Sequence, residues 1–211
     1  PSYNKKIFAV NADASKESEV IKFFKIVKKQ FKYLDGLINN VGVAGPTGSI
    51  EKLNSRDWVR TLYVNVVSHF YFTKQTIPLM KKSKHGSIIN IASGAGIMGF
   101  PLRSPYVASK WAIVGLTKTL AMELGKFKIR VNVICPGTIK GDRMKRVIRD
   151  KAKFTKISPK IIEDDFISMS SMKTWVAEED IGNMCAFLIS NEANKVSGQV
   201  IAVDGNTERM D

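Results

Sequence analysis

Hydrophobic and polar positions along the chain follow two alternating patterns. Short apolar runs of strand length alternate with longer stretches in which apolar residues recur at helical spacing. Val20, Phe24, Val27 and Phe31 show the second pattern, because they fall on one face of a helix. Such alternation is typical of β-α units built around a parallel sheet.

Five apolar runs bounded by turn residues are predicted as strands, at 6–11, 34–40, 86–93, 129–137 and 199–203. Helices are predicted between and after them, at 16–31, 55–82, 105–125 and 178–190. The last helix follows three acidic residues, which suit a helix N-terminus. The strongly charged segment 140–175 is predicted to be an inserted helical segment. The sequence therefore indicates one α/β domain over residues 1–211, without internal repeats.

The composition supports a globular domain. Of the 211 residues, 44% are hydrophobic and 25% charged, which is close to ordinary usage and sufficient for one core. No apolar run approaches the roughly 20 residues of a membrane helix, and no leader pattern opens the chain, so we expect a soluble, cytoplasmic protein. Cys135 and Cys185 lie in apolar segments without metal-ligand spacing. They are interpreted as buried free thiols of a reducing compartment, and no metal site is expected.

The formal net charge of +14 raises nucleic acid as a partner. However, the basic residues are 25 lysines and 8 arginines scattered along nearly every predicted helix. A surface that reads bases or grips phosphates would use more arginine, because the guanidinium group binds both bidentately. A solvated basic surface is therefore the favoured interpretation, with neither nucleic acid nor membrane as a partner.

The most informative string contains Tyr106 and Lys110. Their four-residue separation places both side chains on one face of a helix. A lysine ammonium beside a phenol favours the phenolate, which suits the tyrosine to proton transfer with an alcohol or carbonyl. Taken alone, the pair fits equally well a partly exposed tyrosine beside a solvated lysine.

Two further polar residues change the picture. Ser93 follows a predicted buried strand, at the edge where parallel-sheet enzymes place ligands. Its hydroxyl is positioned to donate to a substrate oxygen, although simple capping is the alternative. Asn65 lies inside the long predicted helix, where asparagine has poor propensity. It indicates a specific partner or a held water, unless the side chain is merely exposed.

Together these residues resemble the short-chain dehydrogenase/reductase family, and the resemblance runs through essentially the whole chain. The matching features are the turn Asn39, Asn40, Val41 and Gly42, the helix asparagine Asn65, the set Ser93, Tyr106 and Lys110, the Pro-Gly segment IRVNVICPGTI and the last strand in SGQVIAVDGN. The resemblance implies a Rossmann-like doubly wound parallel sheet. It also implies an NAD(P)-dependent oxidoreductase acting on the CH–OH group of a secondary alcohol or on a ketone.

The resemblance also implies roles for single residues. Tyr106 would be the general acid/base, and Ser93 would orient the substrate oxygen. Lys110 would hold the nicotinamide ribose, and Asn65 would position a proton-relay water. The cofactor cleft would be lined by Asp13 and Ala14 at the adenine end and, further along, by Asn40, Val41, Gly42, Tyr106, Lys110, Pro136, Gly137 and Ile139.

The chain departs from the family pattern in three places. Val41 replaces the usual alanine, and Gly141 stands where many members carry a carboxamide-binding threonine, a contact that Thr138 would have to supply. The third departure is the absence of the Gly-rich βαβ segment that binds pyrophosphate. The first predicted strand corresponds to the family's third, so the family's first two strands are absent and would leave a gap between this chain's first two. We therefore expect a natural protein longer by about 40 residues, and damaged cofactor binding in this chain alone.

The segment 140–175 corresponds to the family's substrate lid. Its basic residues predict an anionic substrate such as a 3-oxoacyl compound, with Arg143 and Arg146 as the expected contacts. The alternative is a solvated face in a lysine-rich chain. Apolar residues around the helices 55–82 and 105–125 predict a homo-oligomer, a tetramer or a dimer. The choice between NAD and NADP and the identity of the substrate stay open. A catalytically impaired fragment and a non-catalytic dinucleotide-binding member are the rival interpretations.

Overall fold

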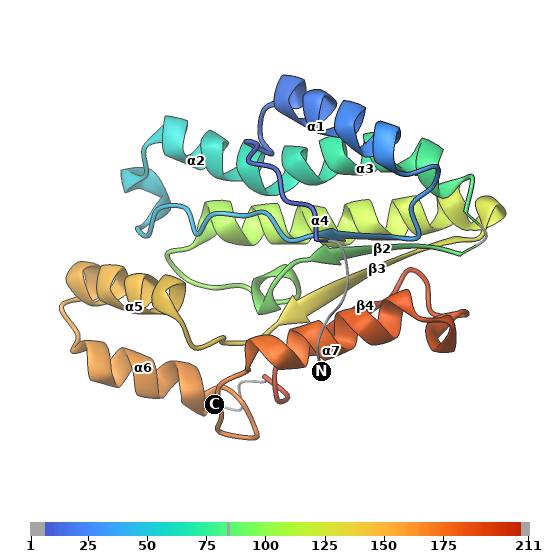
Figure 1. The fold of residues 1–211 in the computed structure, drawn as a ribbon. Helices are drawn as coiled ribbons and strands as arrows, with labels where there is room; N and C mark the ends of the chain where they lie inside the picture. The colour runs from blue at the N-terminus through green and yellow to red at the C-terminus, as the bar shows by residue number, and fades with distance from the viewer. Residues whose placement is uncertain (1–6, 84, 208–211) are drawn as a thin grey trace.

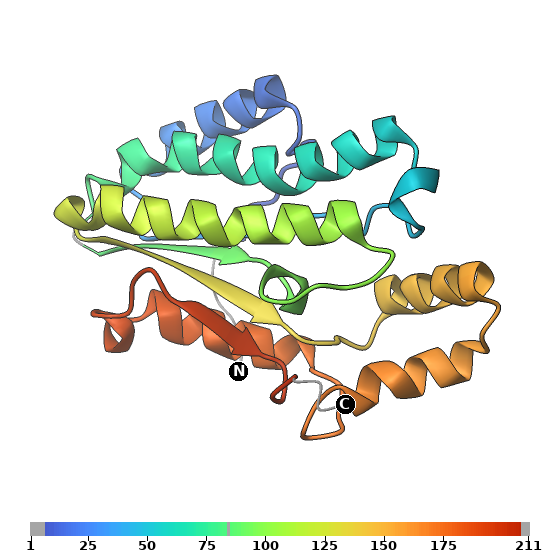
Figure 2. The ribbon, with the colours of Figure 1, turned by 180° about the vertical axis from the view of Figure 1, so that it is seen from behind.

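A computed structural model describes residues 7–83 and 85–207, and its centre is a parallel sheet with helices on both faces (Figure 1; Figure 2). The sheet has the order β1-β2-β3-β4, formed by β1 (Gly36–Asn39), β2 (Gly86–Ile91), β3 (Ile129–Pro136) and β4 (Val200–Val203). All three pairings are parallel, with Asn39 opposite Asn90 and Ile91 opposite Ile134. The carboxyl ends of the strands therefore meet at one edge, where α/β proteins bind ligands.

The two faces of the sheet are covered by different helices. On one face lie α3 (Ser68–Met80) and α4 (Ser104–Leu124), with α1 (Glu17–Gln30) packed on the outside of α3. On the other face lies α7 (Glu178–Ile189). Successive residues of β2 point to opposite faces, as the pleat requires. Thus Ile88 packs in the cluster that contains Leu120 of α4, and Ile89 packs in the cluster that contains Leu188 of α7.

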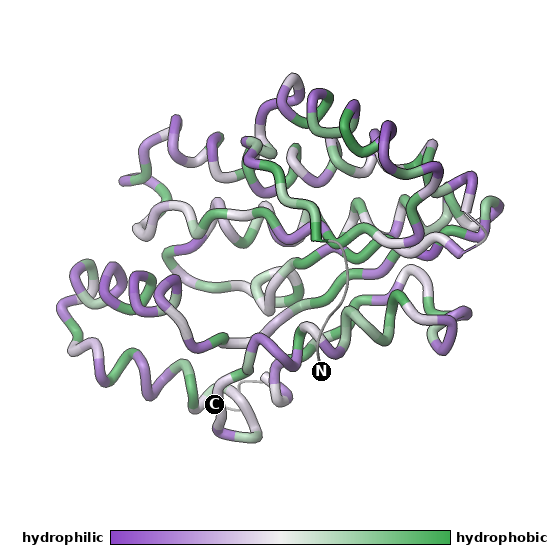
Figure 3. The backbone as a smooth tube through the Cα atoms, viewed as in Figure 1, coloured by the Kyte–Doolittle hydropathy of each residue, from purple (hydrophilic) through white to green (hydrophobic). Residues whose placement is uncertain are grey.

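Beyond the carboxyl end of β3, α5 (Asp142–Thr155) and α6 (Pro159–Ser168) form a helical pair (Figure 1). They share a small apolar cluster of Ile148, Ala152 and Ile162. This pair lies within the segment 140–175 that the sequence predicted to be helical, and α5 is mostly hydrophilic (Figure 3). Single-turn helices complete the described chain, namely η1 (Ile50–Lys52), η3 (Gly94–Gly96), η4 (Gly125–Phe127) and η5 (Asn191–Ala193).

The predicted strand at 6–11 is wrong for its described part. Residues 7–11 have no regular secondary structure, and Lys6 lies outside the described residues. In the described chain no other strand lies beside this segment, so a strand there would leave its backbone N–H and C=O groups without ladder partners. The expected gap in the sheet does not arise either, because β1 is the edge strand. The other four predicted strands and the Rossmann-like parallel sheet are confirmed.

The predicted long helix over 55–82 is confirmed from Ser55 to Met80, with one irregular turn inside it. It consists of α2 (Ser55–Leu62), a π-helical turn η2 (Tyr63–Val67) and α3, which ends at Met80. A π turn inserts an extra residue into a helix and is frequent at functional sites. Here the widened turn contains Asn65, which is fully buried.

A buried polar layer joins the sheet to α3 and α4. The amide nitrogen of Asn39 donates to Asn90 Oδ1 at 2.9 Å and to Thr73 Oγ1 at 3.2 Å. The amide nitrogen of Asn90 donates in turn to Thr117 Oγ1 at 2.9 Å. Because a buried amide is costly unless its hydrogen bonds are made, this ladder fixes the register of β1 and β2 and the seating of both helices.

His69 of α3 lies next to this layer, beneath the turn that follows β1. It is 1% exposed, and its Nε2 lies 3.3 Å from the carbonyl oxygen of Val41. A carbonyl oxygen only accepts, so Nε2 carries the proton and donates. Burial, with a smaller contribution from the nearby Lys110 ammonium, lowers the pKa of His69 to about 4.

This shift predicts a pH-dependent stability. Between pH 6.5 and pH 4 the unfolded chain binds a proton at His69 that the folded chain does not bind, so the free energy of unfolding falls as the pH is lowered. The loss attributable to His69 is about 3 kcal/mol at pH 4. Denaturant unfolding at several pH values should therefore show a steeper decline for the wild type than for His69→Gln. Parallel curves for the two proteins would contradict a neutral, buried His69.

Candidate active site

Tyr106 and Lys110 lie on the first turns of α4, at the carboxyl edge of the sheet. The lysine side chain runs back into the protein, where it is 4% exposed, and Nζ donates to the carbonyl oxygen of Ile91 at 3.0 Å. Nζ also lies 5.7 Å from the centre of the Tyr106 ring. The helical spacing thus does bring the ammonium group beside the phenol, and the end of β2 anchors it there.

The environment of Lys110 is unusual for a lysine. Burial lowers its pKa to about 8, with Arg143 adding a smaller like-charge repulsion and Cys135 opposing the shift. Such a group is still largely protonated at neutral pH, yet it releases its proton more readily than a surface lysine. An ammonium group held in a dry site also interacts more strongly with neighbouring polar groups.

Asn65 forms the connection between two parts of the site. Its Oδ1 accepts from Val43 N at 2.7 Å, and its amide nitrogen donates to Val43 O at 3.1 Å. The same nitrogen donates to Ser109 Oγ at 2.9 Å, and that hydroxyl donates to the backbone carbonyl oxygen of Tyr106 at 2.7 Å. The side chain therefore ties the turn after β1 to the helix of Tyr106. The expected water at Asn65 stays a prediction.

Ser93 lies two residues beyond the end of β2 and precedes η3. Its Oγ accepts from Ala95 N at 3.3 Å, which is the capping arrangement. Capping uses the oxygen as an acceptor only, and the hydroxyl hydrogen stays available to donate. Both interpretations of Ser93 are therefore compatible with its position.

Two glycines expected at the cofactor sit where the structure has little room. A Cβ on Gly42 would lie 3.2 Å from Asn65 Oδ1 and 3.6 Å from Lys110 Nζ. A Cβ on Gly137 would lie 2.6 Å from the Cβ of Asp204, so this glycine lets the ends of β3 and β4 approach. The other expected cofactor residues near this edge are the exposed Asn40 and Val41, the buried Pro136, and Ile139, which pairs with Val176 in an isolated bridge.

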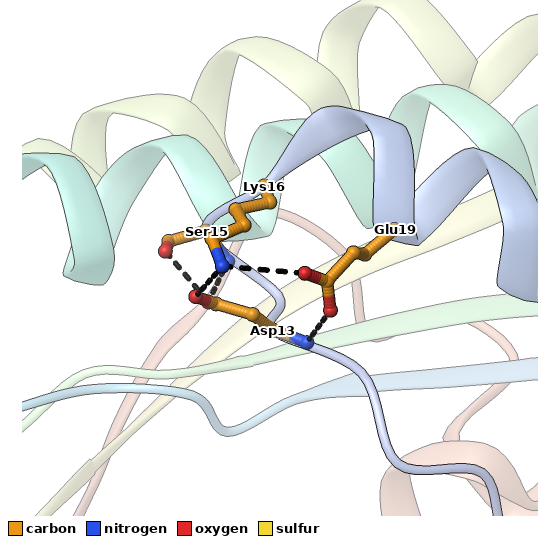
Figure 4. Close-up of polar contacts among 4 residues, drawn as sticks. All are labelled: Asp13, Ser15, Lys16 and Glu19. Carbon is orange, nitrogen blue, oxygen red and sulfur yellow. Dashed lines mark hydrogen bonds and ion pairs between the residues drawn. The ribbon is translucent and has the colours of Figure 1, made fainter.

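Asp13 lies in the turn that precedes α1, where its carboxylate contacts Ser15 and Lys16 (Figure 4). Its Oδ1 accepts from Ser15 N at 3.0 Å and from Ser15 Oγ at 2.6 Å, and Lys16 lies 3.6 Å from Oδ2. The hydrogen bond from the Ser15 hydroxyl is the largest cause of a lowered pKa for Asp13. Ala14 is buried behind it. Asp13 also lines a cleft of about 780 Å³, together with Val41, Val43, Tyr63 and residues of α2.

The two arginines expected to contact the substrate lie in different surroundings. Arg143, on the first turn of α5, donates from Nη2 to the carbonyl oxygen of Gly42 at 2.9 Å. Arg146, one turn along, is exposed. Arg143 therefore reaches the turn expected at the cofactor, and its positive charge is felt by Lys110.

Sequence reasoning missed three residues of the site, Ser109, His69 and Arg103. Arg103 directly precedes α4 and lies half-buried against Tyr106, with its guanidinium carbon 5.0 Å from the centre of the ring. The sequence did contain one signal for Arg103. It places a cation at the N-terminus of a predicted helix, which the helix dipole disfavours, so a specific contact is needed to explain its position. Ser109 and His69 carried no such signal, because both look like ordinary helix residues.

Two classes of site receive no support from the described residues. None of the helices in 7–83 and 85–207 has the length and apolar character to cross a membrane. Within the same ranges, His, Cys, Asp and Glu side chains nowhere gather in threes as metal ligands would.

Known proteins resemble this chain throughout its length. A family model described as enoyl-(acyl carrier protein) reductase matches residues 2–206. The D-beta-hydroxybutyrate dehydrogenase of Rhizobium meliloti (strain 1021) is 34% identical over 195 residues, covering 92% of this chain and 75% of its own.

Solved structures give the same result. Levodione reductase superposes with a TM-score of 0.90 at 27% identity, covering 97% of this chain and 78% of that one. NAD+-bound xylitol dehydrogenase superposes with a TM-score of 0.87 at 31% identity, covering 92% and 77%. This chain belongs to the short-chain dehydrogenase/reductase family, a family of nicotinamide-dependent oxidoreductases.

Proposed function

We propose that this protein is an NAD(P)-dependent dehydrogenase/reductase that interconverts a secondary alcohol and a ketone. The observation that carries the proposal is the position of Lys110, whose buried Nζ is anchored on Ile91 O at 3.0 Å and lies beside the Tyr106 ring. A structural lysine would be expected to pair with a carboxylate or reach solvent. This one does neither among the described residues, and its charge is directed at the phenol and the turn after β1.

The residues fit a nicotinamide dinucleotide at one end of the cleft. Gly42 leaves open a space that a Cβ would occupy, bounded by Asn65 Oδ1 and Lys110 Nζ. Nζ makes one hydrogen bond to protein, and an ammonium group has two further hydrogens for ribose hydroxyls. We assign cofactor contacts to Lys110, Gly42 and Val41 here, and to Asp13 at the adenine end. When bound, the cofactor supplies or accepts the hydride.

The chain's own residues supply position and proton transfer. The Tyr106 hydroxyl gives a proton to the ketone oxygen or takes it from the alcohol. The Ser93 hydroxyl donates to the same oxygen and stabilises charge that develops there. Asn65 acts indirectly, by holding the cofactor turn and the helix of Tyr106 at a fixed separation. The two buried thiols, Cys135 and Cys185, fit a reducing, cytoplasmic location.

Two further parts of the proposal concern the substrate and the assembly. The basic residues of α5 favour an anionic substrate, with Arg143 and Arg146 as its contacts on the lid. A homodimer or homotetramer is favoured by apolar side chains that stay exposed on α2, η2, α3 and α4, namely Val59, Tyr63, Phe70 and Trp111. Ile113 and Val114 of α4 are buried against the sheet and do not belong to this exposed surface.

Replacing Tyr106 by Phe should abolish turnover without unfolding the protein, because only the proton-transferring hydroxyl is removed. The expected loss in kcat is about 10²- to 10⁴-fold. The measurement is NAD(P)H absorbance during reduction of a ketone panel, with circular dichroism to check the fold. Tyr33→Phe, at an exposed position outside the site, is the matched control. Retention of more than roughly a tenth of the wild-type rate would remove Tyr106 from its role.

Arg143→Ala and Arg146→Ala should each lower kcat/KM for an anionic ketone more than for a neutral ketone of equal size. The physical reason is the loss of a cation that attracts the anion toward the site. Steady-state kinetics at two ionic strengths measures the effect, since added salt screens it. An equal loss on both ketones would show that the lid is merely basic.

Light scattering at micromolar concentration should show a dimer or a tetramer. The introduction of Glu at Phe70 and at Trp111 together should shift the protein toward monomer, because a desolvated charge in the interface is costly. Glu at the exposed Ile161 of α6 is the control. A wild-type monomer would rule out this part of the proposal.

A further inference from the structure

Arg103, directly before α4, is held by contacts with the loop after β1 and with Tyr106 of α4. Its Nη2 donates to Ala44 O at 2.9 Å, and its Nη1 donates to Thr47 Oγ1 at 3.1 Å, both in the loop between β1 and α2. The guanidinium group lies over the ring of Tyr106. The loop and the segment before α4 are joined a second time, by Gly48 N donating to Leu102 O at 3.0 Å. The arginine is thus held in place beside the proposed acid/base.

This position is electrostatically unfavourable for a cation. Arg103 stands at the N-terminus of the 21-residue helix α4, where the helix dipole is positive, and its side chain makes no capping bond. Burial lowers the pKa of Arg103, which reflects the cost of removing the charge from water. Leu102 before it adopts a left-handed backbone conformation with φ of 68°, a strained state for a branched residue. Contact with the Tyr106 ring offsets only part of this cost.

No carboxylate neutralises the guanidinium within the described chain. The carboxylate of Asp150 of α5 favours the charged form of Arg103, but it is exposed and forms no ion pair with the guanidinium. Lys110 of α4 and Arg143, whose charge acts on Lys110, add positive charge at this edge of the sheet. A guanidinium group has five N–H donors, and the contacts with Ala44 and Thr47 use two of them. Three N–H donors of this half-buried group are therefore left for another partner, and they lie beside Tyr106.

We propose that Arg103 is the specificity-determining residue of this enzyme and binds a carboxylate of the substrate, so that the substrate is a short oxo acid or hydroxy acid. The inference rests on the proposed function, because it places the reacting carbonyl at Tyr106 and Ser93. The fixed fork of a guanidinium group suits a carboxylate, which it binds through charge-assisted hydrogen bonds. A carboxylate also neutralises the helix N-terminus and the excess positive charge around Lys110 and Arg143. Arg103 is a binding residue here and takes no part in proton transfer.

The first test compares two probes of equal size, 3-oxobutanoate and its neutral amide 3-oxobutanamide, with NADH and with NADPH. The wild type should prefer the acid in kcat/KM. Arg103→Gln should lower kcat/KM for the acid by about 10- to 100-fold, mainly through KM, as expected for loss of a charge-assisted hydrogen bond. The amide should change by less than about twofold, and Arg103→Lys should recover part of the loss. Lys195→Gln, which removes an exposed positive charge after η5 and away from α5, is the control and should change neither.

A purely structural role for Arg103 predicts a different result. If Arg103→Gln lowers kcat/KM for acid and amide by the same factor, the arginine only holds the loop 44–47, and the proposal is wrong. It is equally wrong if the wild type reduces the amide as well as the acid.

A second readout does not depend on turnover. Thermal unfolding at constant ionic strength should show stabilisation of the wild type by butanoate and not by butanamide, and Arg103→Gln should abolish it. If this holds while no ketone is reduced, the carboxylate site stands and the proposed reaction fails. If inorganic phosphate stabilises the wild type and butanoate does not, the site binds a phosphate and the assignment to a carboxylate is overturned.

Discussion

The side-chain amide of Asn65 is the interaction on which the rest of the site depends. Through three hydrogen bonds it joins the turn after β1 to Ser109, and through that hydroxyl to the backbone of Tyr106. A fully buried amide is tolerated only when its partners are in place, so turn, π turn and helix α4 are fixed together or not at all. The π turn places this side chain, and the second buried ladder through Asn39 and Asn90 holds the strands below it.

Around this frame the structure gathers positive charge at a place where burial makes charge costly. Lys110 is almost completely buried, Arg103 is half-buried at a helix N-terminus, and Arg143 reaches over to Gly42. Burial makes the charges of Lys110 and Arg103 costly, whereas Arg143 is exposed. Their concentration at the carboxyl edge of a parallel sheet makes sense for a site that receives anions, since a dinucleotide cofactor and an acidic substrate would both offset the repulsion.

The site also shows why the three arginines near it are not equivalent. Arg146 on α5 is exposed, and Arg143 donates to Gly42 in the turn after β1. Arg103, outside the basic segment 140–175, lies against the ring of Tyr106. The charge density along the sequence directed attention to the segment 140–175 as the contact for an anionic substrate, because this segment carries many cations in a short run. Proximity to Tyr106 instead follows from the left-handed turn at Leu102 and from the two acceptors in the loop 44–47, neither of which a charge pattern contains.

Periodicity and spacing alone determined the parallel α/β architecture, four of its strands, most of its helices, and the pairing of Tyr106 with Lys110. These features are local or depend on one repeating face, so they can be deduced from residue order. The tertiary structure decided what depends on distant partners. It left residues 7–11 irregular, because a strand needs a neighbouring ladder, and it gave Asn65 partners both in the turn after β1 and on α4. It also decided which arginine lies against Tyr106, since that choice depends on loops that meet only after the sheet has formed.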